Sequence, residues 1–390
     1  MPSVKVRLFQ ELRLAAGVSE TRVEAASVSS ALQALVLKYG DQLRDLVFDE
    51  KGSLRNYLQV YLNNRHVPNP LGFSSELKEG DLLLLIPPIG GGYGADQRGI
   101  FKFDLFIPKD SKNLLKFLDR NGQGYTIIAH GSDLVNRIRR GHVKANILVD
   151  ISGIREWSYI GSEEGRIRIG ALTTVTELLE NPLLSSKYPV FQQVANKFGA
   201  PNILNLATVG GNICAASSAE DLLPVFLVLD AKVRLKGLRG ERISRLEDFI
   251  VDKRVIDLEP GEILTEVFFD ELREDEACAY DKVGWRKSLI LALVNIAIFL
   301  QLNKDTETIR NIRVGLNRLK GKIPERAKLT ELKLTGRKLD EEAIQEGIQT
   351  LSSELRVKSD FRASGEYRLE AAKTLFRRVL LQCAENILTR

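Results

Sequence analysis

Hydrophobic and polar residues alternate over residues 4–9 and again over 58–62, as they do in strands with one buried face. Between these strands, apolar residues recur over residues 31–36 at the spacing of one helix face, behind candidate serine caps. Residues 82–86 are all apolar, which is typical of a fully buried strand. This order of strand, helix, strand and strand predicts a small α+β domain over residues 1–94.

A glycine-rich stretch separates this first region from the rest of the chain. Residues 90–94 read Gly-Gly-Gly-Tyr-Gly, and residues 95–99 continue without a hydrophobic run that could contribute to a core. We therefore predict that residues 95–99 are a linker. The remaining chain is predicted to form two further domains, at residues 100–275 and 276–390.

Strand-like and helix-like patterns alternate through the second region, which predicts an α/β arrangement. Short apolar strands are predicted at residues 101–106, 125–129, 147–151 and 167–171, and an apolar helix at 222–229. In the third region, the apolar run at 289–300 predicts a core strand. A final amphipathic helix is predicted with Ala371, Leu375, Val379 and Cys383 on one face. The fold class of the whole chain is therefore predicted to be α+β.

Two glycine-containing turns are candidate binding sites. Residues 127–134 read Ile-Ile-Ala-His-Gly-Ser-Asp-Leu between a predicted strand and a predicted helix, and residues 207–213 read Ala-Thr-Val-Gly-Gly-Asn-Ile. Glycine lets a backbone approach a ligand closely, and successive N–H groups at a helix start favour phosphate. Two such turns would hold one diphosphate from two sides, and the Asp221 carboxylate suits sugar hydroxyl groups. For the glycine pair, the alternative is an ordinary turn between buried segments.

Composition excludes several other kinds of protein. The 390 residues are 44% hydrophobic and 27% charged with a net charge of +5, which is ordinary for a globular protein and does not indicate nucleic-acid binding. The longest apolar run is too short to span a bilayer, and the chain opens directly into a strand pattern without a signal peptide. Three cysteines and three histidines have no metal-ligand or disulfide spacing, so we expect no metal site and a reducing, cytoplasmic location.

Residues 100–390 resemble the FAD-binding medium subunit of the molybdenum hydroxylases, the family of xanthine dehydrogenase and carbon monoxide dehydrogenase. That family carries a turn of the type Ala-Gly-Gly-Thr-Asp-Leu and a second of the type Thr-Val-Gly-Gly-Asn. Here the two turns read Ala-His-Gly-Ser-Asp-Leu at 129–134 and Thr-Val-Gly-Gly-Asn at 208–212. The Asp-Phe-Arg-Ala-Ser segment at 360–364 also matches the C-terminal domain of these subunits.

The resemblance implies that FAD is the cofactor and that both turns bind its diphosphate. It further implies that Asp221 binds the ribityl or ribose hydroxyl groups and that Lys282 lies beside the flavin ring. The implied cofactor-binding residues are Ile128, Ala129, His130, Gly131, Ser132, Asp133, Leu134, Thr208, Val209, Gly210, Gly211, Asn212, Asp221 and Lys282. No catalytic residue is implied in this chain.

The same resemblance implies a fold and a set of partners. The FAD-binding region would be a two-lobed α/β domain of the vanillyl-alcohol-oxidase type, followed by an α+β C-terminal domain. A molybdopterin-binding large subunit would oxidise the substrate, and a small subunit with two 2Fe–2S clusters would pass electrons to this chain. The chain would be an oxidoreductase subunit that passes these electrons to NAD⁺ or another acceptor.

Residues 1–94 resemble the β-grasp, ubiquitin-like sulfur carriers of the MoaD and ThiS type. The similarity rests on the strand pattern, the Glu79-Gly80-Asp81 turn and the prolines that precede the glycines. In that family a C-terminal Gly-Gly is activated, whereas the glycines here are internal. Sulfur carriage would therefore require cleavage after Gly91 or Gly92, and the alternative is a docking domain on a glycine linker.

Four departures from the flavin family leave other functions open. His130 stands where a glycine is usual, Leu204 stands where an arginine is common, and residues 215–218 replace an Asn-Ala-Ser-Pro type of segment. The sequence also lacks the cysteine cluster that gives one branch of the family an extra iron–sulfur centre. One alternative is an assembly factor for molybdenum-cofactor enzymes that keeps the flavin fold as a docking scaffold. Another is a free-standing FAD oxidase with the flavin attached covalently through His130 or Cys214.

Overall fold

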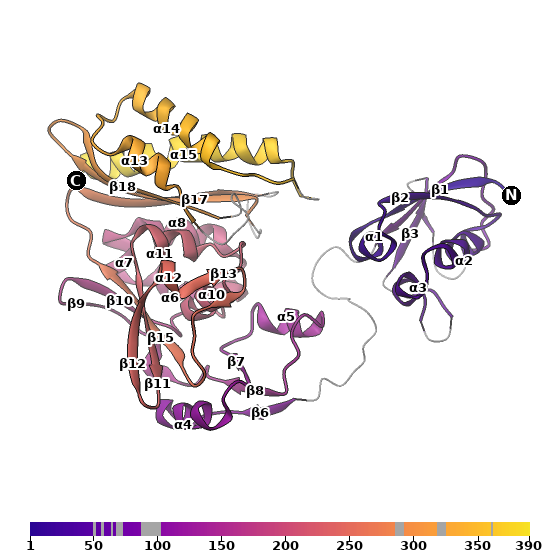
Figure 1. The fold of residues 1–390 in the computed structure, drawn as a ribbon, viewed down its shortest axis with the longest axis horizontal. Helices are drawn as coiled ribbons and strands as arrows, with labels where there is room; N and C mark the ends of the chain where they lie inside the picture. Colours follow the sequence, from indigo (N-terminus) through magenta and orange to yellow (C-terminus); the bar gives the residue numbers. More distant parts are fainter. Residues whose placement is uncertain are drawn as a thin grey trace. The chain divides into compact units, whose positions relative to one another are not determined.

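The computed structural model describes residues 1–49, 52–55, 58–63, 65–67, 73–86, 103–284, 292–317, 325–359 and 362–390. The chain divides into two units, each drawn in Figure 1. One unit contains the residues up to 102 together with residues 135–144, and the other contains residues 103–134 and 145–390.

The N-terminal unit is built around a five-stranded sheet with the strand order β2-β1-β5-β3-β4. Its strands are β1 (Ser3–Leu8), β2 (Glu20–Glu24), β3 (Gln59–Leu62), β4 (Arg65–Val67) and β5 (Leu82–Ile86), and its helices are α1 (Gln10–Ala16), α2 (Val28–Tyr39) and α3 (Asp41–Val47). Strands β1 and β5 run parallel at the centre, while the other neighbouring strands are antiparallel. This topology is the β-grasp fold that the sequence predicted.

Alternation along each strand explains the core of this unit. The side chains on one face of the sheet are buried together with the apolar face of α2, and those between them are more exposed. This core includes Val4, Val6, Leu8, Leu32, Leu35, Leu83 and Leu85. Helix α2 begins behind Ser27, whose hydroxyl accepts a hydrogen bond from the Ser30 amide while the Ser30 hydroxyl accepts one from the Ser27 amide. This reciprocal cap stabilises the helix start.

The second unit begins with a parallel three-stranded sheet in the order β6-β8-β7. Its elements are β6 (Asp104–Phe106), α4 (Ser111–Asn121), β7 (Thr126–Ile128) and β8 (Ile147–Asp150). Helix α5 (Leu134–Arg139) follows β7 in the chain, and all of it after Leu134 is grouped with the first unit. Parallel strands need crossover connections, and helix α4 provides one between β6 and β7. Leu114 and Leu118 of α4 pack against Val149 in a small core, so this sheet forms a lobe of its own.

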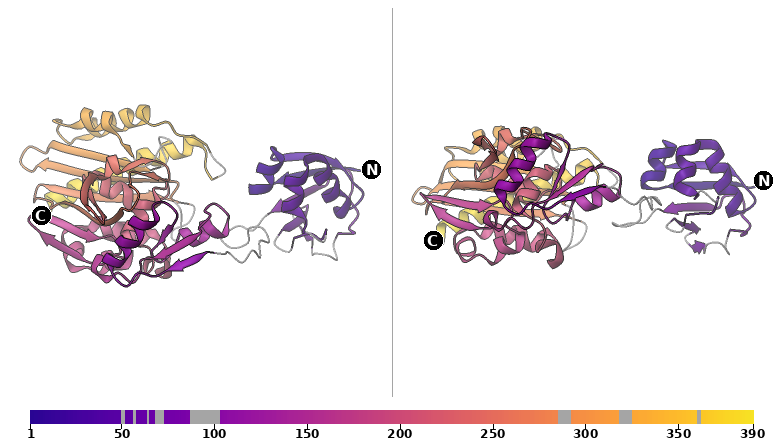
Figure 2. Two further views of the ribbon diagram at one scale, coloured as in Figure 1. Left: turned by 60° about the horizontal axis from the view of Figure 1, so that its bottom comes forward. Right: turned by 90° about the horizontal axis from the view of Figure 1, so that it is seen from below.

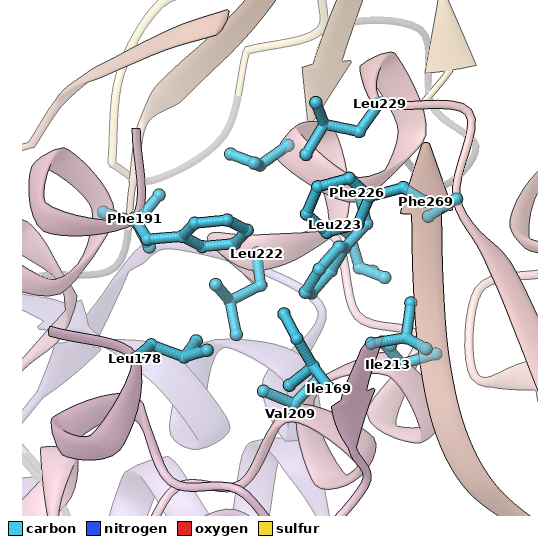
Figure 3. Packing of buried hydrophobic residues seen from close by; sticks show 14 of the residues in the cluster. Ile169, Leu178, Phe191, Val209, Ile213, Leu222, Leu223, Phe226, Leu229 and Phe269 are labelled. Carbon is cyan, nitrogen blue, oxygen red and sulfur yellow. The ribbon is translucent and has the colours of Figure 1, made fainter. Parts of the chain in front are cut away.

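A five-stranded antiparallel sheet, in the order β12-β11-β15-β10-β9, forms a second lobe. Its strands are β9 (Ile160–Glu163), β10 (Arg166–Gly170), β11 (Lys232–Gly237), β12 (Gly240–Arg245) and β15 (Ile263–Asp270), with a hairpin of β13 (Ile250–Asp252) and β14 (Val255–Ile256). The helices are η1 (Arg155–Trp157), α6 (Val175–Glu180), α7 (Pro182–Lys187), α8 (Pro189–Phe198), α9 (Pro201–Leu204), α10 (Val209–Ala215), α11 (Leu222–Val228) and α12 (Leu246–Phe249). Figure 3 shows residues of α6, α8, α10 and α11 meeting the sheet residues Ile169 and Phe269 in one core.

A four-stranded sheet in the order β16-β17-β18-β19 forms the C-terminal part. Its elements are β16 (Glu276–Val283), β17 (Val294–Asn303), β18 (Thr308–Asn317), β19 (Glu325–Arg326), α13 (Lys328–Leu334), α14 (Glu341–Glu354) and α15 (Gly365–Leu388). Helices α13 to α15 lie on one side of the sheet and α8 and α11 on the other (Figures 1 and 2). Tyr280 and Phe299 belong to the core with α11, whereas Ile296 and Ile298 belong to the core with α15. Strand β17 is buried on both faces, which explains why its sequence is a nearly continuous apolar run.

Helix α11 lies directly against β18 because the strand has a glycine at the point of contact. A Cβ atom at Gly315 would lie 2.8 Å from the Pro224 carbonyl oxygen and 2.9 Å from Val228 Cγ1. All seven residues of α11 are buried. The absence of a side chain at Gly315 therefore sets how closely α11, and Asp221 just before it, approach the C-terminal sheet.

The predicted fold class and most predicted elements are confirmed, including strands in each of the three predicted regions and the final helix. Helices α1 and α3 and the strands β2 and β4 were not predicted, because they are short and have weak periodicity. The prolines at 87–88, the glycine stretch, the predicted linker and residues 360–361 lie outside the described residues. Within the described part of the chain, no helix has the length and hydrophobicity needed to cross a membrane.

We expect Gly315→Ala to destabilise the protein, because the new methyl group would force α11 away from β18. Overpacking of this kind typically costs about 1–3 kcal/mol. The free energy of unfolding, measured by urea denaturation, should fall by this amount. Gly161→Ala in strand β9 is the matched control, since its Cβ atom would meet nothing within 4 Å. Equal stability of the two variants would contradict the packing argument.

Candidate functional site

The first predicted turn joins β7 to α5 and has open backbone donors. Gly131 has a φ of 76°, a left-handed conformation that glycine adopts without strain. The backbone N–H groups of His130 and Gly131 donate no hydrogen bond to any described residue. The Nδ1 atom of His130 is also buried without a partner in the described part of the chain. This turn therefore has unused hydrogen-bonding groups of the kind that bind an anion.

The second predicted turn is instead the start of a helix, so the prediction of a turn there was wrong. Thr208 caps α10, and its hydroxyl accepts a hydrogen bond of 3.1 Å from the Gly211 amide. The amide of Val209 donates to the Thr173 carbonyl, that of Gly210 to the Ala171 carbonyl, and that of Asn212 to the Thr208 carbonyl. The backbone donors of residues 209–212 are thus used within the protein, and the binding of a diphosphate by this segment stays a prediction.

The glycine pair of α10 is explained by packing inside the protein. A Cβ atom at Gly210 would lie 2.7 Å from the Cβ atom of Ala171, at the end of β10. At Gly211 it would lie 2.7 Å from the capping hydroxyl of Thr208. The glycines bring the helix start against the end of the strand, so packing within the protein accounts for them.

The two segments nevertheless come together around Arg254. The Nη1 atom of Arg254 lies 2.9 Å from Oδ2 of Asp133 in the first turn. The same atom donates to the carbonyl of Ala215, at the end of α10, over 3.2 Å. The first turn and the end of helix α10 therefore both contact Arg254.

Asp221 is buried in a polar cluster between α11 and the C-terminal sheet. Its Oδ1 atom accepts hydrogen bonds from the Tyr280 hydroxyl, at 2.7 Å, and from Asn295 Nδ2, at 3.2 Å. Its Oδ2 atom lies 2.5 Å from Nζ of Lys282. These contacts give Asp221 a structural role in addition to the role predicted for it in binding sugar hydroxyl groups.

Lys282, predicted to lie beside a flavin ring, forms a buried ion pair with Asp221. The side chains of Lys282 and Asp221 are only 5% and 6% exposed. Burial raises the pKa of Asp221, and the charge of Lys282 acts in the opposite direction. Because the carboxylate balances the ammonium group, the pair brings no net charge to the site.

Two asparagines fix the backbone next to Asp221. Asn295 and Asn317 lie opposite each other on β17 and β18, and both Nδ2 atoms reach the carbonyl of Glu220, at 3.4 and 2.9 Å. Both side chains are buried, and the Oδ1 atom of each has no partner among the described residues. Sequence analysis missed this pair, although an asparagine inside the apolar run at 289–300 was a visible signal.

Glu220 connects this cluster to helix α10. Its carboxyl group accepts a hydrogen bond from Nδ2 of Asn212, whose Oδ1 atom is buried and has no partner among the described residues. Burial, together with the charges of Asp133 and Asp221, raises the pKa of Glu220 to about 8, although the charge of Arg254 and the hydrogen bond from Asn212 oppose this shift. Glu220 therefore holds a proton at neutral pH and can donate a hydrogen bond.

The arrangement fits FAD in its hydrogen-bonding groups. Phosphate oxygens would accept hydrogen bonds from the open amides of His130 and Gly131, whereas hydroxyl groups would donate to the buried Oδ1 atom of Asn212. Buried polar atoms without partners are rare and costly, so these atoms favour a polar ligand at this place.

The departures from the flavin family have structural explanations. Leu204 is buried at the end of α9 as part of the large core. Ala216 ends α10 with a φ of 41°, and the buried Ser217 accepts a hydrogen bond from the Ala219 amide. Burial raises the pKa of the Cys214 thiol to about 12, so almost no reactive thiolate is present at neutral pH. This disfavours covalent attachment of a flavin through Cys214.

Three known protein families match successive parts of this chain. Residues 101–269 match the family described as "FAD binding domain in molybdopterin dehydrogenase", and residues 279–383 match "CO dehydrogenase flavoprotein C-terminal domain". Residues 6–92 match the ThiS family. The first two families together span most of the second unit.

Individual relatives cover the same part of the chain. The nicotinate dehydrogenase FAD-subunit of Eubacterium barkeri is 31% identical over 292 residues, which are 73% of this chain and 97% of that protein. The glyceraldehyde dehydrogenase medium chain of Sulfolobus acidocaldarius is 28% identical and covers 70% of this chain and 95% of that protein. A crystal structure of Cu,Mo-CO dehydrogenase aligns with a TM-score of 0.68 at 25% identity, over 73% of this chain and 98% of the other. The chain belongs to the family of FAD-binding medium subunits of molybdenum hydroxylases, fused to an N-terminal ThiS-like domain.

We expect the stability of the protein to fall with rising pH through ionisation of Glu220. The folded state binds the Glu220 proton more tightly than the unfolded chain, in which the pKa is near 4.5. This contribution is therefore present below pH 4.5 and is lost as the pH rises through about 8.

The Glu220→Gln variant should lose less stability than the parent protein when the pH is raised from 4.5 to about 8. Urea unfolding at several pH values would measure this difference. Glu180→Gln, at an exposed position of α6, is the control and should follow the parent curve. Parallel curves for Glu220→Gln and the parent would contradict the prediction.

We expect Lys282→Met to destabilise the FAD-free protein by about 3–5 kcal/mol, because it leaves the buried Asp221 carboxylate without its charge partner. The double variant Asp221→Asn with Lys282→Met should lose less, since no buried charge remains. Urea unfolding of both variants tests this. Lys373→Met, which breaks the surface pair with Glu370, should cost less than about 1 kcal/mol. A double variant that is less stable than Lys282→Met would disprove the ion-pair argument.

Proposed function

We propose that this chain binds FAD between the turn at residues 128–134 and helix α10, and transfers electrons within a molybdenum hydroxylase complex. A molybdopterin-binding large subunit would oxidise the substrate, and a small subunit with 2Fe–2S clusters would deliver the electrons. NAD⁺ or another acceptor would receive them. We also propose the domain boundaries 1–94, 100–275 and 276–390, with residues 95–99 as a linker.

The observation that carries this proposal is the pair of open amides at His130 and Gly131, next to the buried unpartnered atoms of His130 and Asn212. The amides would hold phosphate oxygens, because they have no acceptor among the described residues. Thr208, Val209, Gly210 and Gly211 would shape the opposite wall rather than donate backbone hydrogen bonds. Because the carboxyl group of Glu220 would be protonated, it would add no negative charge near the diphosphate.

Asp221 and Lys282 would act as a unit on the side of the C-terminal sheet. Oδ1 of Asp221 already accepts two hydrogen bonds, whereas Oδ2 accepts only that of Lys282 among the described residues. Oδ2 therefore keeps a lone pair for a ribityl or ribose hydroxyl group. Lys282 would lie near the pyrimidine edge of the flavin ring, and the ion pair with Asp221 would hold its ammonium group in place.

FAD would supply the chemistry that the chain's own residues lack, since it takes up electrons singly and releases them as a pair. The sequence has three scattered cysteines, too few and too far apart for iron–sulfur ligation. We therefore place the iron–sulfur and molybdenum centres on other chains. The protein's part is to bind and orient the cofactor.

The ThiS-like domain supports a second proposal, a role in assembly of the molybdenum enzyme. The match over residues 6–92 includes the glycines at 90–92, which in a sulfur carrier end the chain. Here they are internal, so the domain would dock a partner as it stands. It would carry sulfur only after cleavage behind Gly91 or Gly92.

The purified full-length chain should show a two-banded flavin absorption spectrum, either as isolated or after incubation with FAD. The flavin should be released on denaturation, at about one FAD per chain, because binding is expected to be non-covalent. Absorption of the released cofactor measures this ratio. A protein that stays colourless after incubation with FAD would contradict the proposal, and an intact mass matching cleavage after Gly91 or Gly92 would favour the assembly role.

A further inference from the structure

Arg254 lies outside both glycine motifs, and both its backbone conformation and its contacts are unusual. It lies in the turn between β13 and β14 with a φ of 65°, a left-handed conformation that is unfavourable for a residue with a Cβ atom. Its own amide donates to the carbonyl of Ala216 over 2.8 Å. A strained backbone at a well-defined contact points to a specific use of the side chain.

The side chain of Arg254 links the two segments that flank the candidate site. Its Nη1 atom contacts Asp133, 121 residues earlier in the sequence, and the carbonyl of Ala215, 39 residues earlier. Its Nε and Nη2 atoms donate no hydrogen bond to a described residue. The side chain is 30% exposed, so part of it can be reached by a ligand.

Arg254 lies in a group of neighbouring charged side chains. Asp133 and Asp221 both raise the pKa of Glu220, and Arg254 lowers it, so the four groups share one electrostatic environment. Lys282 is already balanced by Asp221. A diphosphate brought to this place adds negative charge, and a guanidinium group matches phosphate oxygens with parallel N–H donors.

We propose that Arg254 binds the diphosphate of FAD with its free guanidinium N–H groups, while its Nη1 atom holds the first turn and the end of α10 together. This inference rests on the proposed function, in which FAD lies between these two segments. Asp133 then orients the guanidinium group and competes with the phosphate for it. Arg254 supplies the guanidinium N–H donors that the backbone of α10 does not provide.

The test compares the affinity of the full-length, FAD-free chain for FAD in four variants. Arg254→Asn removes the charge but keeps a residue that tolerates left-handed backbone, and Arg254→Lys keeps the charge without the planar donors. Asp133→Asn frees the guanidinium group from its ion pair. Arg245→Asn removes an arginine that is paired with Asp230 over 3.0 Å elsewhere in the same lobe, and is the matched control.

We expect Arg254→Asn to raise the dissociation constant for FAD by about ten- to a hundredfold, the usual effect of losing a hydrogen bond to a charged group. Arg254→Lys should recover part of this loss, and Arg245→Asn should bind as the parent does. Asp133→Asn breaks the same ion pair but keeps the guanidinium group, so it should lose less affinity than Arg254→Asn. Fluorescence titration with FAD measures the affinities, and urea unfolding without FAD measures folding of each variant.

The opposite pattern would overturn the proposal. Unchanged affinity in a folded Arg254→Asn variant would exclude contact with the diphosphate. Equal losses of affinity and of FAD-free stability in Arg254→Asn and Asp133→Asn would assign Arg254 a purely structural role. In both cases the parent protein still binds FAD, whereas a parent protein that does not bind FAD would refute the proposed function itself.

Discussion

The buried carboxylate of Asp221 is the point at which the FAD-binding lobe is held to the C-terminal sheet. Its side-chain partners among the described residues, Tyr280, Lys282 and Asn295, lie on β16 and β17. An isolated buried charge is very costly, so the carboxylate must remain at its partners for the protein to fold. Together with the close approach at Gly315, this interaction sets the position of α11 against the sheet. The position of Glu220, and through it that of Asn212, follows from the same interaction.

The two glycine segments have different tasks. In the segment at 208–212 the amides are used to cap and anchor helix α10, so that this segment forms a rigid wall. In the first turn, the amides of His130 and Gly131 have no acceptor among the described residues. The site therefore combines one rigid segment with one segment whose donors are open. The His130 side chain, a departure from the family pattern, adds a buried nitrogen atom without a partner on the open side.

The N-terminal unit has its own sheet and its own core. Its central parallel pair of β1 and β5 and the capped helix α2 are complete within the described residues. No residue of the proposed FAD site comes from the β-grasp domain. The β-grasp domain and the flavin subunit are thus two separate modules of one chain, and the internal position of the glycines at 90–92 favours docking over sulfur transfer unless the chain is cleaved.

The sequence by itself determined the modules, the class of fold and the family, because these depend on periodicity and on short motifs that are local in the chain. It also drew attention to the first turn and to the segment of α10, and Arg254 contacts Asp133 of the one and Ala215 at the end of the other. Only the tertiary structure decided which acceptor each donor reaches. The Gly210 amide donates to the Ala171 carbonyl, and the Lys282 ammonium group pairs with the Asp221 carboxylate. It also identified Arg254, Asn317 and Glu220, which belong to no motif. These contacts join residues far apart in the sequence, and the free energy of burying a charge or an amide depends on neighbours that local patterns do not contain.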